Sequence, residues 1–148
     1  MKEEFPRSDP GAAPLSPEQS APARKGMLVV YYGDGAGRRE AAVGVLFRAH
    51  GRGLTVRHMT FAPPGDSPTG DDLALDRIGI PSNHMAQEGS VGAKGLWQKA
   101  MRHISIVQEG VLVLDGLLDA IGKEWLSVPD VLEELAGNES LLLNYVTI

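Results

Sequence analysis

Three glycines spaced two residues apart, followed by two consecutive arginines, come directly after the first apolar run of the chain. A glycine-rich turn of this kind can point backbone N–H groups at an anion, and a helix that begins there adds the positive end of its dipole. Guanidinium groups also pair well with phosphate oxygens. The spacing therefore predicts a phosphate-binding segment made of Gly33, Asp34, Gly35, Ala36, Gly37, Arg38 and Arg39.

This segment departs from the general phosphate-loop pattern, G-x-x-x-x-G-K-[ST], at three positions. Tyr32 stands at the first glycine, Arg38 at the lysine and Arg39 at the Ser/Thr position. Arg38 can still pair with an oxyanion, although its planar fork has a different geometry from an ammonium group. Arg39 has no hydroxyl group to coordinate magnesium. Glu40 suits the helix dipole but opposes a bound polyphosphate.

Asp115 is the second residue with a chemical role. It follows the apolar run VLVL, and in phosphate-loop proteins an aspartate at such a strand end positions magnesium. We therefore expect Asp115 to be the magnesium ligand of the site. The four histidines lack spacings such as H-x-x-x-H, so the sequence predicts no histidine metal site.

A strand and a helix must position the glycine segment. Residues 27–32 are apolar, which predicts a fully buried strand. Residues 40–48 are helical in character, with Ala41, Val45 and Ala49 on one face. Further strands are predicted at 54–61, 111–114 and 141–148, with a short extended segment at 79–85 whose Pro81 indicates a sheet edge.

Helices are predicted between these strands. Asp71 and Asp72 are expected to cap a short helix that runs to Arg77, and 93–107 has apolar residues at helical spacing. Ser127 is the expected N-cap of a last helix that ends near 136. Strands that alternate with helices predict an α/β fold with a mostly parallel sheet and right-handed crossovers.

Length and composition favour one globular domain. The chain has 148 residues, of which 43% are hydrophobic and 22% charged. Residues 1–25 contain five of the ten prolines and few large apolar side chains, so we expect a disordered tail before an α/β domain at 26–148. A docking arm is the alternative. The net charge of −5 argues against a general nucleic-acid binder.

The composition bears on the compartment of the protein and on its relation to membranes. There are no cysteines, which fits a reducing cytoplasm. No apolar run approaches the roughly 20 residues that a membrane span needs, and the N-terminus has no apolar signal-peptide core. We therefore expect a cytoplasmic protein with no membrane partner.

The segment VVYYGDGAGRREAAVGVLFRAHGRGLTV resembles the ATP:corrinoid adenosyltransferases, whose loop reads T-G-N-G-K-G-K-T-T-A-A before a helix that ends R-A-x-G-x-G. The later stretch VLVLDGLLDAIGKEWLSVPDVLEEL is similar to the family's V-V-L-D-E-L and the helix after it. The resemblance covers roughly residues 26–148. The matching positions are Gly33, Gly35, Gly37, Ala41, Ala42, Arg48, Ala49, Gly51, Gly53, Val113, Leu114, Asp115 and Leu117.

This resemblance implies a P-loop NTPase-like, three-layer α/β/α fold. It also implies transfer of the 5′-deoxyadenosyl group from ATP to a reduced corrinoid, with magnesium, and assembly as a homodimer or with a partner protein. The departures are Ala36, Arg38, Arg39 and Glu40 in place of two lysines and two threonines, and Gly116 in place of a glutamate. The family's F-T-W stretch has no clear match, and Ile148 precedes its T-G-R segment.

Three hypotheses follow from these residues. The chain is a divergent adenosyltransferase, or a catalytically inactive member that acts as a binding or regulatory partner. Alternatively, it is a general anion- or nucleotide-binding module in which Arg38 and Arg39 hold a different phosphate ligand.

Overall fold

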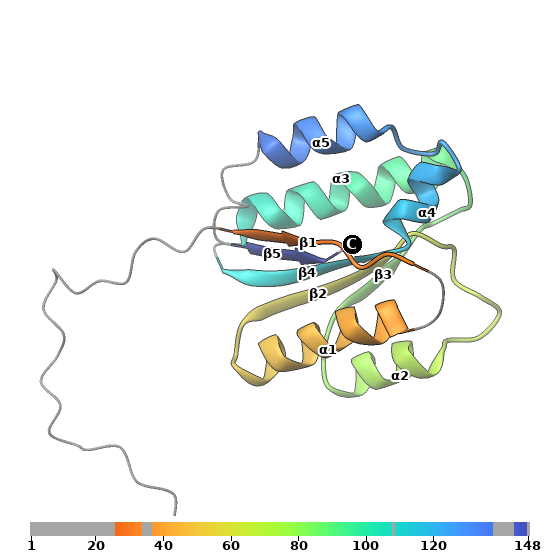
Figure 1. Ribbon diagram of the computed structural model, residues 1–148. Coiled ribbons are helices and arrows are strands. Elements are labelled where there is room, and N and C mark those ends of the chain that lie inside the picture. The colour runs from red at the N-terminus through yellow and green to blue at the C-terminus, as the bar shows by residue number, and fades with distance from the viewer. Residues whose placement is uncertain (1–25, 34–36, 108, 138–143, 148) are drawn as a thin grey trace, which may run out of the picture.

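The computed structural model describes residues 26–33, 37–107, 109–137 and 144–147. Strands and helices alternate along this part of the chain (Figure 1). In chain order they are β1 (Met27–Val29), α1 (Gly37–Gly51), β2 (Thr55–Thr60), α2 (Gly70–Arg77), β3 (Ser82–His84), α3 (Ser90–Ile106), β4 (Gly110–Asp115), α4 (Leu117–Gly122), α5 (Val128–Ala136) and β5 (Asn144–Thr147).

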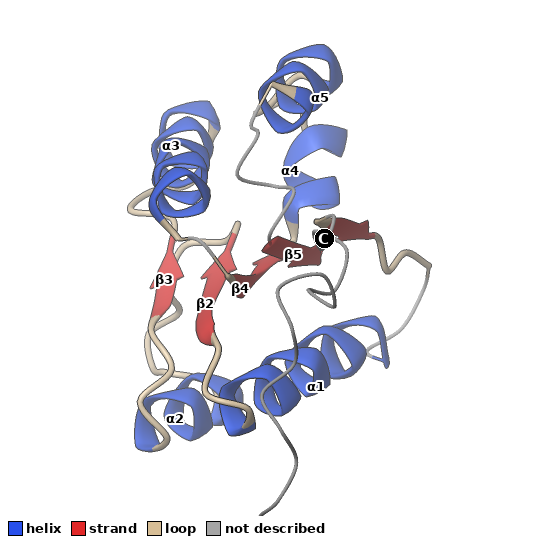
Figure 2. Cartoon of the chain, turned by 90° about the vertical axis from the view of Figure 1, so that its left-hand side faces the viewer, coloured by secondary structure: helices blue, strands red, loops and turns tan. Residues whose placement is uncertain are grey.

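The strands form one five-stranded sheet in the order β1-β5-β4-β2-β3, and every pair is parallel. Figure 2 shows the sheet between two helical layers, with α1 and α2 on one face and α3, α4 and α5 on the other. This confirms the predicted α/β/α fold, consistent with a P-loop NTPase-like architecture. Because parallel strands point the same way, the carboxyl ends of β2, β3 and β4 meet at one edge of the sheet.

Both faces of β4 are covered, which explains its uninterrupted apolar sequence. Val111 and Val113 pack under α1 and α2, whereas Leu112 and Leu114 pack under the other three helices. All four side chains are at most 5% exposed. Burial of this kind contributes roughly 25 cal/mol per Å² of apolar surface removed from water, so β4 anchors the sheet from which Asp115 emerges.

The prediction of a fully buried strand at 27–32 is wrong. Regular pairing ends at Val29, and Met27, Leu28, Val30 and Tyr32 are between 43% and 82% exposed. The physical reason is position: β1 is an edge strand that pairs with β5 alone. The apolar composition of residues 27–32 predicts a strand, but it does not show whether that strand lies at the centre or at the edge of the sheet.

Two further details of the helices differ from expectation. The buried face of α1 is formed by Ala42, Val43, Leu46 and Ala49, rather than by Ala41, Val45 and Ala49. The N-cap of α2 is Thr69, whose hydroxyl accepts a hydrogen bond from the backbone N–H of Asp72. The side chain of Asp72 accepts from the backbone N–H of Thr69, which completes a capping box.

Other predictions hold. Ser127 caps α5 by accepting a hydrogen bond from the backbone N–H of Asp130, and β3 is the second edge strand of the sheet. The buried stripe of α3 contains Leu96, Ala100 and Ile104, with Trp97 beside them. The predicted tail at 1–25 lies outside the described residues.

Candidate phosphate site at the start of α1

The predicted glycine segment connects β1 to α1. Gly33 has a φ of +121°, a conformation that favours glycine, and Gly37 is the first residue of α1. Asp34, Gly35 and Ala36 lie outside the described residues. The first turn of α1 lies beside the end of β4, because Arg39 contacts Asp115 there. The dipole of α1 favours a negative charge at this end.

A small pocket of about 50 Å³ lies between α1 and the end of β4. Both predicted arginines line it, together with Asp115. A volume of this size corresponds to one or two water molecules. The remaining lining residues are Tyr31, Ala42, Gly116, Leu117, Leu118 and Asp119.

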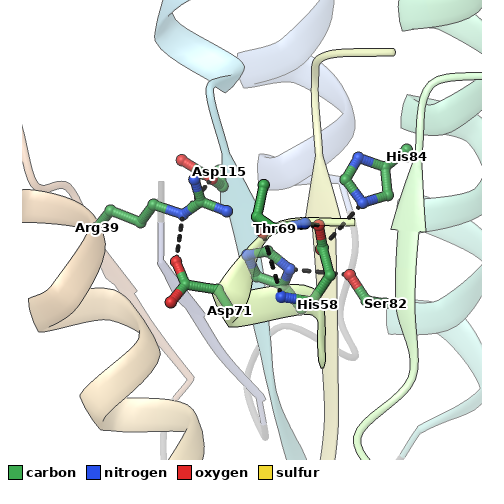
Figure 3. Close-up of polar contacts among 8 residues, drawn as sticks. Arg39, His58, Thr69, Asp71, Ser82, His84 and Asp115 are labelled. Atoms are coloured by element: carbon green, nitrogen blue, oxygen red, sulfur yellow. Dashed lines mark hydrogen bonds and ion pairs between the residues drawn. The ribbon is translucent and has the colours of Figure 1, made fainter. Parts of the chain in front are cut away.

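Arg39 joins three separate elements through its guanidinium group (Figure 3). Its Nε atom lies 3.2 Å from Oδ2 of Asp115, at the end of β4, and 3.2 Å from Oδ2 of Asp71, in the first turn of α2. The side chain of Arg39 is 32% exposed and that of Asp115 is 25% exposed. Two carboxylates therefore share one partly buried cation, and we call these three residues the arginine triad.

Polar side chains also cross the sheet at this edge in a single row. The register places Thr60 of β2 opposite Asp115 of β4 on one side and opposite His84 of β3 on the other. Two residues earlier on both strands, and so on the same face, His58 is opposite Ser82, and the His58 Nδ1 atom lies 3.1 Å from the Ser82 Oγ atom. Parallel partners point to the same face, so this row lies under α1 and α2 beside the arginine triad.

His58 is held as a neutral imidazole. Its side chain is 0% exposed. Burial lowers its pKa below the ordinary histidine value, against the opposing effect of nearby Asp115 and with the help of nearby Arg39. Among the described residues, the buried side-chain atoms at this edge that have no hydrogen-bond partner are Arg39 Nε, His58 Nε2, Thr60 Oγ1 and His84 Nδ1.

Asp72 connects the start of α2 to β3. Its Oδ1 atom lies 3.1 Å from Nε2 of His84. Burial raises the pKa of Asp72, but hydrogen bonds from the Thr69 side chain and backbone and from His84 outweigh this effect, so its pKa is lowered overall. Asp72 is therefore a charged residue that joins α2 to the sheet.

The side chains present do not suit a magnesium ion. Magnesium prefers about six oxygen ligands in octahedral geometry. Here the position that would supply a hydroxyl is Arg39, and the carboxylate of Asp115 is already paired with a guanidinium group. Within the described ranges, no group of three or more His, Cys, Asp or Glu side chains is placed to hold a metal ion. The role of Asp115 as a magnesium ligand stays a prediction.

The structure brings the predicted residues Arg38, Arg39 and Asp115 together around one pocket. It adds Asp71, for which the sequence predicts only a role as a helix cap. It also adds the His58–Ser82 contact. The motif T-x-x-D at Thr69–Asp72 is a capping-box signature and would have identified the correct N-cap. The ion pair between α1 and α2 has no comparable local signal.

A second and larger pocket has a volume of about 590 Å³ and shares no lining residue with the first. It is formed by the loop that follows β2, by α2 and by β3, and its lining includes Asp72, Ser82 and His84. None of the residues predicted to bind phosphate lines it.

No helix in the described part of the chain has the length and apolar character to cross a membrane.

Comparison with known proteins identifies the family of this chain. The family described as ATP:corrinoid adenosyltransferase BtuR/CobO/CobP matches residues 24–146. The corrinoid adenosyltransferase of Escherichia coli (strain K12) is 26% identical over 121 residues, which cover 75% of this chain and 61% of that protein. The chain thus spans less than two thirds of the length of this relative.

Two further relatives give a similar picture. The corrinoid adenosyltransferase CobA of Salmonella typhimurium is 26% identical over 83% of this chain and 69% of its own length. The corrinoid adenosyltransferase of Pseudomonas aeruginosa is 28% identical over 84% of this chain and 68% of its own length. Because the family match extends over nearly the whole α/β domain, the chain belongs to the ATP:corrinoid adenosyltransferase family.

Proposed function

We propose that this chain is a member of the family that binds a nucleotide or another phosphate-bearing ligand but does not transfer the adenosyl group. The observation that carries the proposal is the ion pair between Arg39 and Asp115, with Nε 3.2 Å from Oδ2. It occupies the two positions at which the family pattern has a hydroxyl and a metal-positioning carboxylate. The chain would then act as a binding or regulatory partner, with itself or with another protein.

The chemistry of the transfer explains why this pair matters. In the family reaction, a reduced corrinoid attacks the ribose C5′ of ATP and triphosphate leaves. The protein must hold the two reactants in line and neutralise the charge that develops on the leaving group. Arg38 remains to do so, but the two arginines and two aspartates that line the pocket cancel in formal charge. Asp71 adds a further negative charge beside Arg39.

Ligand binding itself has firmer support than catalysis. The N-terminus of α1 faces the pocket, and Arg38 is exposed and lines it. A helix N-terminus with one exposed guanidinium group is sufficient to attract a phosphate. We therefore expect measurable binding of ATP without turnover.

A divergent but active adenosyltransferase is the second candidate. The observation that favours it is the extent of the family match, from residue 24 to residue 146, which includes both Arg38 and Asp115. In this case Arg38 would take the role of the family's lysine and would contact the phosphates of ATP. The reduced corrinoid would be the second substrate.

The two candidates are separated by a turnover assay. The chain is incubated anaerobically with ATP, magnesium and chemically reduced cob(I)alamin, and the adenosylated product is quantified by chromatography. The Escherichia coli relative serves as the positive control, and the Arg38→Ala variant as the negative control. We expect no product above the level of a protein-free sample. Product formation that disappears in Arg38→Ala would establish the active enzyme instead.

The partner role has its own measurement. A chain that works by association should form a defined homodimer or a stable complex, which light scattering coupled to size exclusion detects. We expect a dimer, as the resemblance implies. If the chain is a monomer at all accessible concentrations, it does not act by forming a homodimer. The proposed partner role would then require a complex with a different protein.

A further inference from the structure

We propose that the guanidinium group of Arg39 takes the place of the divalent cation in this site, so that the site binds a phosphate-bearing ligand without a metal ion. The inference rests on the proposed phosphate binding at the start of α1. The inference adds the identity of the counter-ion, which is the guanidinium group of Arg39. It also adds the chemical class of the ligand, which is a phosphate ester or polyphosphate without a bound metal ion.

The first step is the position of Arg39. It is the second residue after Gly37, where the phosphate-loop pattern has a Ser/Thr hydroxyl that binds the metal. From the first turn of α1 its side chain reaches the end of β4, and Nε lies 3.2 Å from Oδ2 of Asp115. The side chain thus places a positive charge against the carboxylate that would otherwise face a metal.

The second step is the number of N–H donors. A guanidinium group has five, in one plane. The Nε atom lies 3.2 Å from Oδ2 of Asp71 and 3.2 Å from Oδ2 of Asp115, and both contacts are ion pairs, because Nε has no hydrogen-bond partner among the described residues. The two terminal amino groups are the remaining donors of the side chain. Among the described residues no hydrogen bond from these amino groups is found, and Arg39 lines the pocket beside Arg38. These donors suit a phosphate oxygen, with which arginine forms paired hydrogen bonds.

The third step is the fit of the alternative cation. A magnesium ion bound to Asp115 would lie within a few ångströms of the guanidinium group and would be repelled by it. It would also lack the hydroxyl ligand. Asp71, in the first turn of α2, also holds Arg39 in place, with the Arg39 Nε atom 3.2 Å from the Asp71 Oδ2 atom. This contact favours the guanidinium group over a magnesium ion at this position. Two carboxylates on one side and a ligand phosphate on the other would complete the environment of the guanidinium group.

The test is isothermal titration calorimetry of ATP and of inorganic tripolyphosphate, each measured with EDTA and again with excess magnesium. We expect both ligands to bind in EDTA, and magnesium to change the affinity less than about threefold. Arg39→Thr, which restores the hydroxyl, should lose at least about tenfold in affinity in EDTA. In the same variant, magnesium should now increase the affinity.

Matched variants guard against a general loss of structure. Arg39→Lys keeps the positive charge and should retain metal-free binding better than Arg39→Thr. Arg52→Ala, at an exposed site after α1, should bind like the wild type. Circular dichroism and the unfolding midpoint of each variant establish that it is folded.

The outcomes separate this inference from the proposal on which it rests. Binding by the wild type that requires magnesium would overturn the inference and leave phosphate binding in place. The same holds if Arg39→Thr binds both ligands in EDTA as tightly as the wild type. No heat of binding from either ligand in either buffer would overturn both.

Discussion

Arg39, in the first turn of α1, forms an ion pair with Asp115, the last residue of β4, and the Nε and Oδ2 atoms are 3.2 Å apart. The two residues are far apart in sequence and meet because α1 packs on the face of the sheet to which Asp115 points. In the family pattern a metal would connect these two positions. Here the guanidinium group of Arg39 contacts Asp115 directly, so we expect the pair to contribute to stability without a bound ligand.

The strength of this pair is the first prediction. Both side chains are about a quarter to a third exposed, so we expect a coupling free energy of about 1 kcal/mol, at the upper end for partly solvated ion pairs. A double-mutant cycle with Arg39→Met and Asp115→Asn, read by urea denaturation, measures it. The matched cycle of Arg39 with Asp71, which is 50% exposed, should give a smaller value. An equal or larger coupling to Asp71 would show that Asp115 is not the main partner.

The second prediction concerns pH. The pKa of His58 is lowered by burial, so in the folded chain it binds its proton only below the ordinary value of about 6.5. Between the lowered pKa of the folded chain and the ordinary pKa of the unfolded chain, the unfolded chain binds more protons than the folded chain. The free energy of unfolding therefore rises with pH over this range. Stability should fall as the pH drops from 7 through about 6.5, and should level off only below the folded pKa. Burial together with nearby Arg57 lowers the pKa of His103 in the same direction.

Urea denaturation at several pH values tests this dependence. His58→Gln should reduce the slope of stability against pH, even though it also lowers stability overall, and His103→Gln should remove its own separate share. NMR titration of the wild-type imidazole signals gives the folded pKa of His58 directly. A His58 pKa at or above the ordinary value would contradict the prediction.

The third prediction concerns the capping box of α2. The Thr69 hydroxyl accepts from the backbone N–H of Asp72 at 3.2 Å and donates to its carboxylate at 2.7 Å. Thr69→Ala should cost about 1 kcal/mol, the usual value of an N-cap side chain. Thr69→Ser keeps the hydroxyl and should cost little. Urea midpoints at an unchanged m-value provide the comparison, and equal losses in the two variants would indicate that the methyl group, rather than the cap, is responsible.

Local patterns predicted most of this fold. The run VLVL predicted β4 because a strand covered on both faces is apolar at every position. Ser127 predicted the start of α5 because its hydroxyl is an intrinsic partner for the first free N–H groups of a helix. Each of these signals lies within a few residues, and this is why it could be read from the sequence.

The errors have non-local causes. Whether residues 27–32 were buried depended on where β1 stands in the sheet, and that order depends on crossovers between distant segments. In α1, alanines at 41, 42 and 49 gave no clear apolar stripe, so the buried face was misplaced by one residue. The role of Asp71 depended on how α2 packs beside α1. The glycine segment was correctly placed between strand and helix, but the carboxylates that pair with its Arg39 come from two other elements, α2 and β4.

The last prediction compares two glycines of α3 that have different surroundings. A Cβ atom added to Gly92 would lie 1.8 Å from the backbone oxygen of Gln87 and 2.9 Å from its carbonyl carbon. Gly92→Ala must therefore displace backbone and should destabilise the chain by more than about 2 kcal/mol. A Cβ atom on Gly95 meets nothing within 4 Å. Gly95→Ala should stabilise by about 0.5–1 kcal/mol, because alanine is the better helix former and restricts the unfolded chain. The two substitutions add the same methyl group to the same helix, so their difference isolates the contact with Gln87. Urea denaturation should move the two midpoints in opposite directions, and a shift in the same direction would mean that the turn before α3 yields to a side chain at Gly92.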